Sequence, residues 1–269
     1  MPPRYRFLLR RKWIVLHVLL IVSVVAMINL GFWQLRRLDE KRTRNDEIRD
    51  RSAQPVSPIG DLVDPDEPVS VGGELRFRAV SASGTYAPED QFLLRSRDRD
   101  GQPGFWVYTP LDLGDGTAVA IDRGWIPAGR ETDGSDVDFP TPTGPVTVVG
   151  LIEQSFPDPR PSGERQTTVA HADLDWFDDQ TEADAFPVAI QLQGQDPAPT
   201  GDLPVVLPPP ELDEGPHLSY AVQWFLFTAV ALIGYPILIV RTARQQESEP
   251  DATGEGSEDA MGDPVGAAQ

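Results

Sequence analysis

Histidine is the side chain of this sequence best suited to binding a metal or moving a proton near neutral pH, and the chain has three of them. His217 is distinctive because it lies where a proline-rich stretch gives way to a long apolar segment. On a helix, residues spaced three, four, seven, eight and eleven positions apart share a face. That face carries His217, Tyr220, Ala221, Trp224, Phe225 and Thr228. Imidazole, aromatic rings and apolar carbon atoms on one face at membrane depth suit a flat porphyrin whose iron is bound by His217.

A second interpretation of the same residues is an aromatic belt at a membrane interface, in which His217 only begins the helix. The residues alone favour this belt. If the two apolar segments run antiparallel, His17 lies about 13 residues, or roughly 20 Å, below the level of His217, so the two imidazoles cannot share one iron. At the level of His217 the first segment offers only Asn29, Trp33 and Gln34.

The other two histidines have structural explanations. His171 lies in a polar stretch that is typical of a solvated loop. His17 lies one turn inside the first apolar segment, where an imidazole can reach the interface or bond to a neighbour.

Catalytic motifs are absent from the sequence. The chain has no cysteine, which excludes disulfides, thiolate metal sites and thiol nucleophiles. It has no phosphate-binding glycine loop, no HExxH and no GxSxG, and no carboxylate is singled out by a neighbouring histidine. Four arginines could bind an anion, although balancing local charge is the favoured interpretation: Arg95, Arg97, Arg99 and Arg123. The sequence therefore predicts a protein that is not an enzyme.

Two charge-free apolar segments must position these residues, one from Trp13 to Leu35 and one from Leu218 to Val240. A helix of 23 residues is about 34 Å long, against roughly 30 Å for the hydrocarbon core of a bilayer. The first segment is too long for a cleaved signal peptide and lacks a small-residue cleavage site. Both are therefore predicted to be transmembrane helices.

Charge is distributed unevenly along this chain, whose net charge is −19. Residues 1–44 carry ten basic and two acidic side chains, whereas residues 245–269 carry seven acidic and no basic ones. The acidic middle of the chain excludes nucleic acid as a partner. Basic residues 1–12, together with Arg241 and Arg244, favour a cytoplasmic location for both termini, although further basic residues follow the first span.

Between the spans the sequence predicts mainly β structure. Helix continues from Leu35 to Arg51, and prolines then end it. Short β-prone runs follow, with a hairpin signal at Asp115-Gly116, and a short helix is expected near 173–180. The expected fold is α+β overall, with a small antiparallel barrel or sandwich between two transmembrane helices. Residues 128–144 and 157–185 look like acidic loops, and the tail from Gln245 looks disordered.

The sequence accordingly divides into seven parts. They are a basic N-terminus (1–12), a first span (13–35), a juxtamembrane helix and linker (36–68), a β-rich domain (69–195), a proline-rich linker (196–216), a second span (217–240) and an acidic tail (241–269).

Three blocks of sequence together resemble the SURF1 family of cytochrome c oxidase assembly factors. The exit from the first span resembles the family's G-x-W-Q-x-x-R-x-x-x-K pattern, filled by Gly31, Trp33, Gln34, Arg37 and Lys41. Residues 104–111 and 120–127 are similar to two of its strands, the second including Arg123, Gly124, Trp125 and Pro127. Residues 215–225 are similar to its entry into the second span, with His217, Tyr220 and Trp224 in place.

The resemblance implies a protein of the cell membrane whose β domain is extracytoplasmic. It also implies a role in building haem-copper oxidases, with haem a held for delivery to the catalytic subunit and His217 as the iron ligand. Expected partners are that subunit, the machinery that makes haem a, and the lipid bilayer. The acidic loops and tail depart from the family pattern and leave the partner contacts open.

Two other functions remain open from the sequence. One is a membrane scaffold that docks on the oxidase without carrying a cofactor. The other is an extracytoplasmic enzyme or sensor with two membrane anchors, which would need a conserved polar pocket in the β domain.

Overall fold

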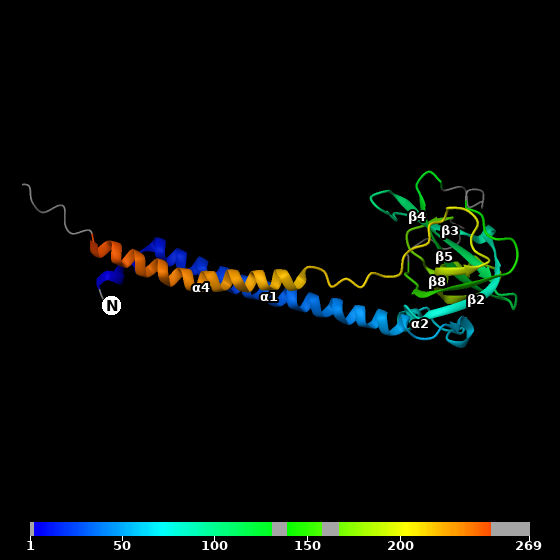
Figure 1. Cartoon of the computed structure of the whole chain (residues 1–269), viewed down its shortest axis with the longest axis horizontal. Helices are drawn as coiled ribbons and strands as arrows, with labels where there is room; N and C mark the ends of the chain where they lie inside the picture. Colours follow the sequence, from blue (N-terminus) through cyan, green and yellow to red (C-terminus); the bar gives the residue numbers. More distant parts are fainter. Residues whose placement is uncertain (1–2, 131–138, 158–166, 249–269) are drawn as a thin grey trace, which may run out of the picture. The chain divides into compact units, whose positions relative to one another are not determined.

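The computed structural model describes residues 3–130, 139–157 and 167–248. The chain divides into two compact units, one formed by Met1–Arg42 with Glu214–Gln269 and the other by Thr43–Asp213. Helix α1 (Arg11–Ser52) belongs to the first unit as far as Arg42, and its last ten residues belong to the second. Figure 1 shows the order of the elements along the chain.

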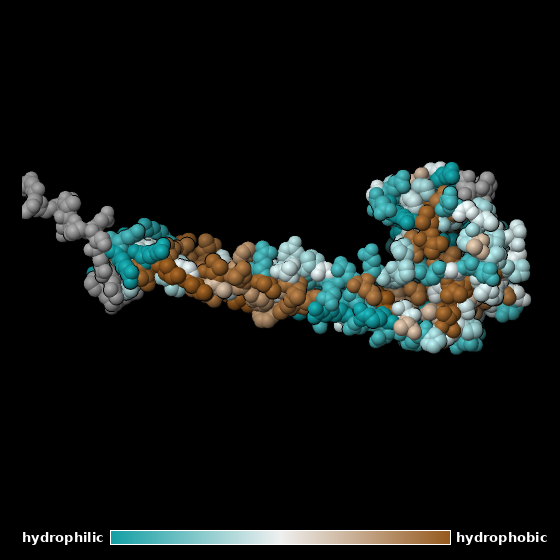
Figure 2. All heavy atoms as spheres, viewed as in Figure 1, coloured by the Kyte–Doolittle hydropathy of each residue, from teal (hydrophilic) through white to brown (hydrophobic). Residues whose placement is uncertain are grey.

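The first unit consists of α1, α4 (His217–Ser248) and a short 3-10 helix, η1 (Pro3–Leu9). Both long helices are apolar enough to cross a membrane, and almost none of their most apolar windows is buried within the protein. Figure 2 shows these hydrophobic residues as a continuous brown stretch. Side chains such as Leu19, Val22, Val222 and Ile233 are more than half exposed, which is unfavourable in water and favourable in lipid. The expected transmembrane helices are confirmed as two long apolar helices near the two ends of the chain.

The second unit contains a closed barrel. Its strands are β2 (Ala79–Tyr86), β4 (Gly104–Asp112), β5 (Thr117–Pro127), β6 (Val146–Gln154) and β8 (Asp184–Asp196). They pair in the order β2-β6-β8-β5-β4, and β4 returns to β2 through Thr85 with Asp112 and Tyr86 with Leu111. Closure leaves these strands no open edge. The prediction of a small β barrel is therefore confirmed, and the sandwich is excluded.

Smaller elements complete this unit. Strands β1 (Ser57–Pro58), β3 (Phe92–Leu94) and β7 (Thr168–Val169) extend the sheet, together with α2 (Val71–Leu75), α3 (Leu174–Asp178), η2 (Ile59–Asp61) and η3 (Pro88–Asp90). The barrel is not purely antiparallel, because β5 and β8 pair in parallel. The chain reaches β8 from β6 through β7 and α3, and this long connection allows β8 to run in the same direction as β5.

Valine, leucine and isoleucine side chains fill the inside of the barrel. Val80, Val119, Ile121, Val148 and Ile190 are fully buried there. On the outside, α3 buries Leu174 and Phe177 against Phe92 and Tyr108. The strands are thus covered on both sides, and apolar side chains point both into the barrel and out of it. This explains why apolar and polar residues alternate only weakly in the sequence of these strands.

Two predictions about the ends of elements have different outcomes. The helix expected to continue to Arg51 does so, and Arg51 donates hydrogen bonds to the carbonyl oxygens of Gly73 and Arg76, each at 3.2 Å. The tail was expected to be disordered from Gln245, but α4 continues through Gln245 to Ser248. Residues 131–138, 158–166 and 249–269, which include parts of the predicted acidic loops and most of the predicted tail, lie outside the described residues.

Candidate functional site

His217 and Gln34 form the centre of the candidate site, within the first unit. The imidazole Nδ1 of His217, at the start of α4, lies 2.8 Å from Oε1 of Gln34 on α1. A carbonyl oxygen only accepts hydrogen bonds, so Nδ1 carries the proton and donates it. The neutral ring then has its lone pair on Nε2, which is the atom available to bind a metal.

Gly215 keeps the Nε2 edge of this ring open. A Cβ atom at position 215 would lie 3.4 Å from both Nε2 and Cδ2 of His217. The backbone there has a φ of +67°, a conformation that glycine adopts at little cost. Among the described residues, Gln34 supplies the one hydrogen bond made by the His217 ring. A fixed tautomer with the lone pair on Nε2 is what an axial ligand of haem iron requires.

The residues of the predicted porphyrin face of α4 differ in how exposed they are. Ala221 and Thr228 are buried at 1% and 7% exposure, and Trp224 and Phe225 are partly buried. A Cβ atom at Gly31 of α1 would lie 2.7 Å from the ring of Phe225, so α1 packs closely on this face. Tyr220 is 48% exposed and lies at the margin of the contact. The close packing of α1 on α4 leaves no room for a flat ligand between the helices at this level, so Tyr220 is the residue of this face that could contact a porphyrin held by His217.

The other histidines do not join His217. His17 Nδ1 is hydrogen-bonded to the hydroxyl of Tyr235, near the opposite end of the helix pair. Seventeen residues of α1 separate His17 from Gln34, which is about 26 Å of helix. His171 is exposed in the second unit. Asn29, which the sequence places at the same level as His217, donates a hydrogen bond to the carbonyl oxygen of Val25 at 2.7 Å.

The first family block on α1 has residues in three kinds of environment. Gly31 and Gln34 lie against α4, as described above, whereas Trp33 is 46% exposed. Arg37 is ion-paired with Glu40 at 2.6 Å on the helix surface. Lys41 is partly buried and lies on the same helical face as Gln34, two turns further along.

The second family block lies in the barrel, where its residues contact two segments that are distant in sequence. Arg123 is 3% exposed and donates to the carbonyl oxygens of Phe139 and Pro140 at 3.2 and 2.8 Å. It therefore does not balance surface charge, as the sequence suggested; it holds the segment that begins at Phe139. Gly124 has a φ of +122°, and a Cβ there would lie 2.2 Å from the carbonyl oxygen of Val205.

Trp125 and Pro127, which belong to the same block, make further contacts of this kind. Trp125 exchanges two backbone hydrogen bonds with Val205, at 2.9 and 2.8 Å, and its indole donates to the carbonyl of Arg97 at 2.8 Å. Pro127 pairs with Gly104 at the end of the β4–β5 ladder. The block has a structural role: it attaches part of the proline-rich segment before α4 to the barrel.

Sequence reasoning missed a buried polar cluster on the outer side of the barrel. The hydroxyl of Tyr108 donates to Glu153 at 2.8 Å. Burial, and then the nearby charge of Glu153, raises the pKa of Asp122 well above its ordinary value. Burial likewise raises the pKa of Glu153. The available signal was a charged residue, Asp122, inside an otherwise apolar β-prone run.

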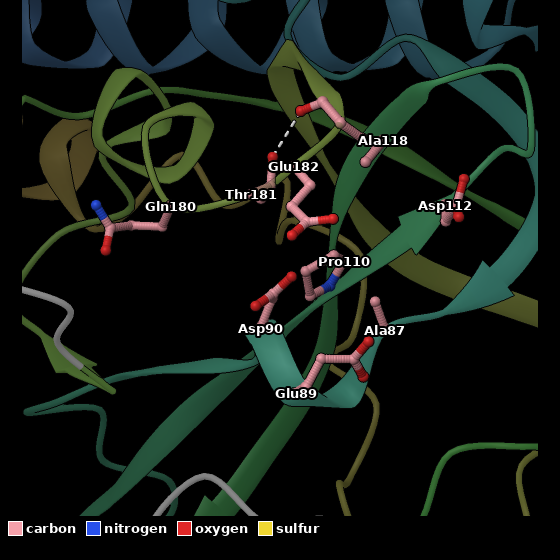
Figure 3. A pocket seen from close by; sticks show the side chains of 10 residues that line it. Ala87, Glu89, Asp90, Pro110, Asp112, Ala118, Gln180, Thr181 and Glu182 are labelled. Carbon is pink, nitrogen blue, oxygen red and sulfur yellow. Dashed lines mark hydrogen bonds between the residues drawn. The ribbon is translucent and has the colours of Figure 1, made fainter.

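The second unit also has a pocket of about 490 Å³ near the β4–β5 hairpin. Figure 3 shows its lining, which includes the carboxylates of Glu89, Asp90, Asp112 and Glu182. Its lining is polar and acidic. Its negative charge disfavours anions, and a haem carries carboxylates, so this pocket is not a plausible haem site. No group of three or more metal-ligating side chains occurs among the described residues.

Comparison with known proteins places these observations in a family. The model of the SURF1 family matches residues 21–229. An uncharacterized SURF1-like protein of Mycobacterium tuberculosis is 32% identical over 237 residues, which cover 86% of this chain and 85% of the relative. A SURF1-like protein of Dictyostelium discoideum is 31% identical over 110 residues, covering 40% of this chain and 41% of the relative. The cytochrome oxidase assembly protein SHY1 of Saccharomyces cerevisiae is 27% identical over 116 residues, or 43% of this chain and 28% of the relative. The chain therefore belongs to the SURF1 family.

Proposed function

We propose that this protein assists the assembly of a haem-copper (cytochrome c) oxidase by binding haem a through His217 and aiding its insertion into the catalytic subunit. The protein acts as a carrier and chaperone and not as an enzyme. Family membership and the name of the yeast relative support the oxidase role. The observation that carries the haem role is the hydrogen bond from His217 Nδ1 to Gln34, which leaves Nε2 to bind iron.

The chain contributes binding and orientation at this site. Gln34 fixes the imidazole tautomer, Gly215 keeps the Nε2 edge accessible, and Tyr220 and Trp224 offer aromatic surface to a porphyrin. Haem a, when bound, supplies the iron. Its apolar ring and long isoprenoid tail favour lipid over water, which suits a site at the boundary of a membrane helix.

The proposed setting is the cell membrane, with both termini in the cytoplasm and the barrel outside it. The basic residues at 1–12, together with Arg241 and Arg244 in α4 beyond the second apolar span, support this orientation. His217 begins α4, so it would lie in the outer leaflet. The proposed partners are the catalytic subunit of the oxidase and the machinery that makes haem a.

Haem absorption of the purified full-length protein tests this function. Protein prepared in mild detergent from cells that make haem a should show a Soret band, and His217→Ala should remove most of it. His171→Ala is the matched control, because His171 is exposed in the second unit, and it should leave the band intact. A Soret band that persists in His217→Ala contradicts the assignment of the ligand.

The alternative of a cofactor-free scaffold gives a different result. Such a protein co-purifies with the oxidase catalytic subunit but shows no haem absorption in the wild type. Measuring both co-purification and the Soret band therefore separates the carrier from the scaffold, and loss of both rejects the oxidase role.

A further inference from the structure

A haem bound at His217 has charged groups that the site described so far does not accommodate. Every haem carries two propionate carboxylates on one edge, and a carboxylate in the apolar part of a bilayer is costly unless it is paired. We propose that Lys41 binds a haem propionate and thereby orients the haem, with its propionate edge toward the aqueous boundary and its opposite edge toward lipid. This inference rests on the proposed function.

The position of Lys41 on α1 is the first observation that carries this inference. Gln34, Leu38 and Lys41 are spaced by four and seven residues, so they share one helical face, and Leu38 is 4% exposed on it. Lys41 lies about 10 Å along the helix beyond Gln34, in the direction away from the apolar span. This separation is comparable with the distance from a haem iron to its propionate carboxylates, and the lysine side chain adds reach.

An ion pair between Arg42 and Glu214 brings the segment before His217 close to the helical turn that carries Lys41. Arg42, the residue after Lys41, is 2.9 Å from the carboxylate of Glu214, which lies three residues before His217. One end of the segment 214–217 is thereby attached to the helical turn that carries Lys41, and the other end is attached to Gln34. A ligand of His217 that extends away from the span meets this turn.

The charges around Lys41 favour a carboxylate from outside the protein. Arg37 is paired with Glu40 and Arg42 with Glu214, so these two carboxylates each already have an arginine partner. Lys41 makes no ion pair with any residue that the structure describes. A lysine that is partly buried and makes no ion pair with the described residues is a suitable partner for a propionate.

Titration of the full-length protein in detergent with haemin and with haemin dimethyl ester tests this proposal. The ester has no propionate charge but the same iron and ring. The wild type should bind haemin roughly tenfold more tightly than the ester, and Lys41→Gln should abolish this preference by weakening haemin binding alone. Arg36→Gln is the matched control: it removes one positive charge from the same boundary, but Arg36 lies about 200° around the helix from Gln34. It should keep the preference.

The outcomes separate this inference from the proposed function. If Lys41→Gln keeps the wild-type preference for haemin, or if the wild type has none, Lys41 does not bind a propionate even when the Soret band and the His217 dependence are intact. If Arg36→Gln loses the preference as completely as Lys41→Gln, general charge explains it and the inference is wrong. If neither compound gives a Soret band that depends on His217, the proposed function itself fails.

Discussion

At the scale of single residues, the most informative contact is the one between two side chains 183 positions apart in sequence, Gln34 and His217. The amide of Gln34 selects the tautomer that leaves Nε2 as the metal-binding atom. Partners of this kind typically affect metal affinity by about 10–100-fold. Gln34→Leu should therefore weaken haemin binding by about that factor, as measured by absorbance titration. Asn29→Leu removes an amide whose hydrogen bond, to Val25, lies within its own helix, and it should leave the affinity unchanged. Equal affinities of Gln34→Leu and wild type would rule out this role.

Asp122 gives a prediction about pH at the same scale. Burial, reinforced by Glu153, raises the pKa of Asp122 in the folded protein above its value of about 3.9 in an unfolded chain. The folded state then holds a proton that the unfolded state releases, so stability falls as pH rises above the unfolded value. The barrel should melt at a higher temperature at pH 5 than at pH 7.5, and Asp122→Asn should reduce this difference, because an amide does not titrate. The amide oxygen can still accept from the backbone N–H of Gly124, so the local structure is kept.

A matched surface variant separates burial from net charge in that experiment. Asp98→Asn makes the same change of charge at an exposed position and should leave the slope of melting temperature against pH close to that of the wild type. If the two variants change the slope equally, repulsion within this acidic protein explains the effect and the burial of Asp122 does not.

At the scale of elements, the close approach of α1 and α4 depends on Gly31. A Cβ at that position would lie 2.7 Å from the ring of Phe225. Gly31→Val should force the helices apart near Gln34 and His217 and lower haemin affinity by about tenfold, through loss of the orienting hydrogen bond.

A second substitution tests whether that loss arises from the steric clash. Phe225→Ala added to Gly31→Val removes the ring and should restore much of the affinity. Gly234→Val, in α4 where no atom lies within 4 Å of a new Cβ, should have little effect. Failure of the double variant to recover, with Gly234→Val intact, would show that Gly31 acts in some other way.

At the scale of the whole molecule, the expected topology can be measured cleanly because the chain has no cysteine. Single variants Leu9→Cys, Asp98→Cys and Gln245→Cys place one thiol at each exposed region. A membrane-impermeant maleimide applied to intact cells should label only Asp98→Cys, and the other two should react after permeabilisation. Carbonate washing should leave all three proteins in the membrane. The reverse labelling pattern would overturn the orientation, and release by carbonate would overturn the spans.

Charge differs between the barrel pocket and the region of the candidate site. The four carboxylates around the barrel pocket repel a propionate-bearing ligand, whereas the basic residues just beyond the first span attract one. Haem binding is therefore expected at the helix pair, and the barrel is expected to serve other contacts.

Local sequence by itself determined the features that arise from local physics. The two spans follow from length and the absence of charge, the strands from β-prone runs between turns, and the hairpin from Asp115-Gly116. His217 was identified as a candidate because helical spacing alone places it with aromatic residues. Very short elements such as β1 and β7 were missed, because two residues carry no periodic signal.

Only the tertiary structure decided which distant residues meet. Closure of the barrel through β2 and β4, the parallel pairing of β5 with β8, and the bonding of Val205 to Trp125 all depend on the path of the chain between strands. The same holds for Gln34 with His217, and for the burial that raises the pKa of Asp122. Periodicity fixes which face of an element a residue occupies, but the partner of that face is set by packing across the whole chain, and no local pattern encodes it.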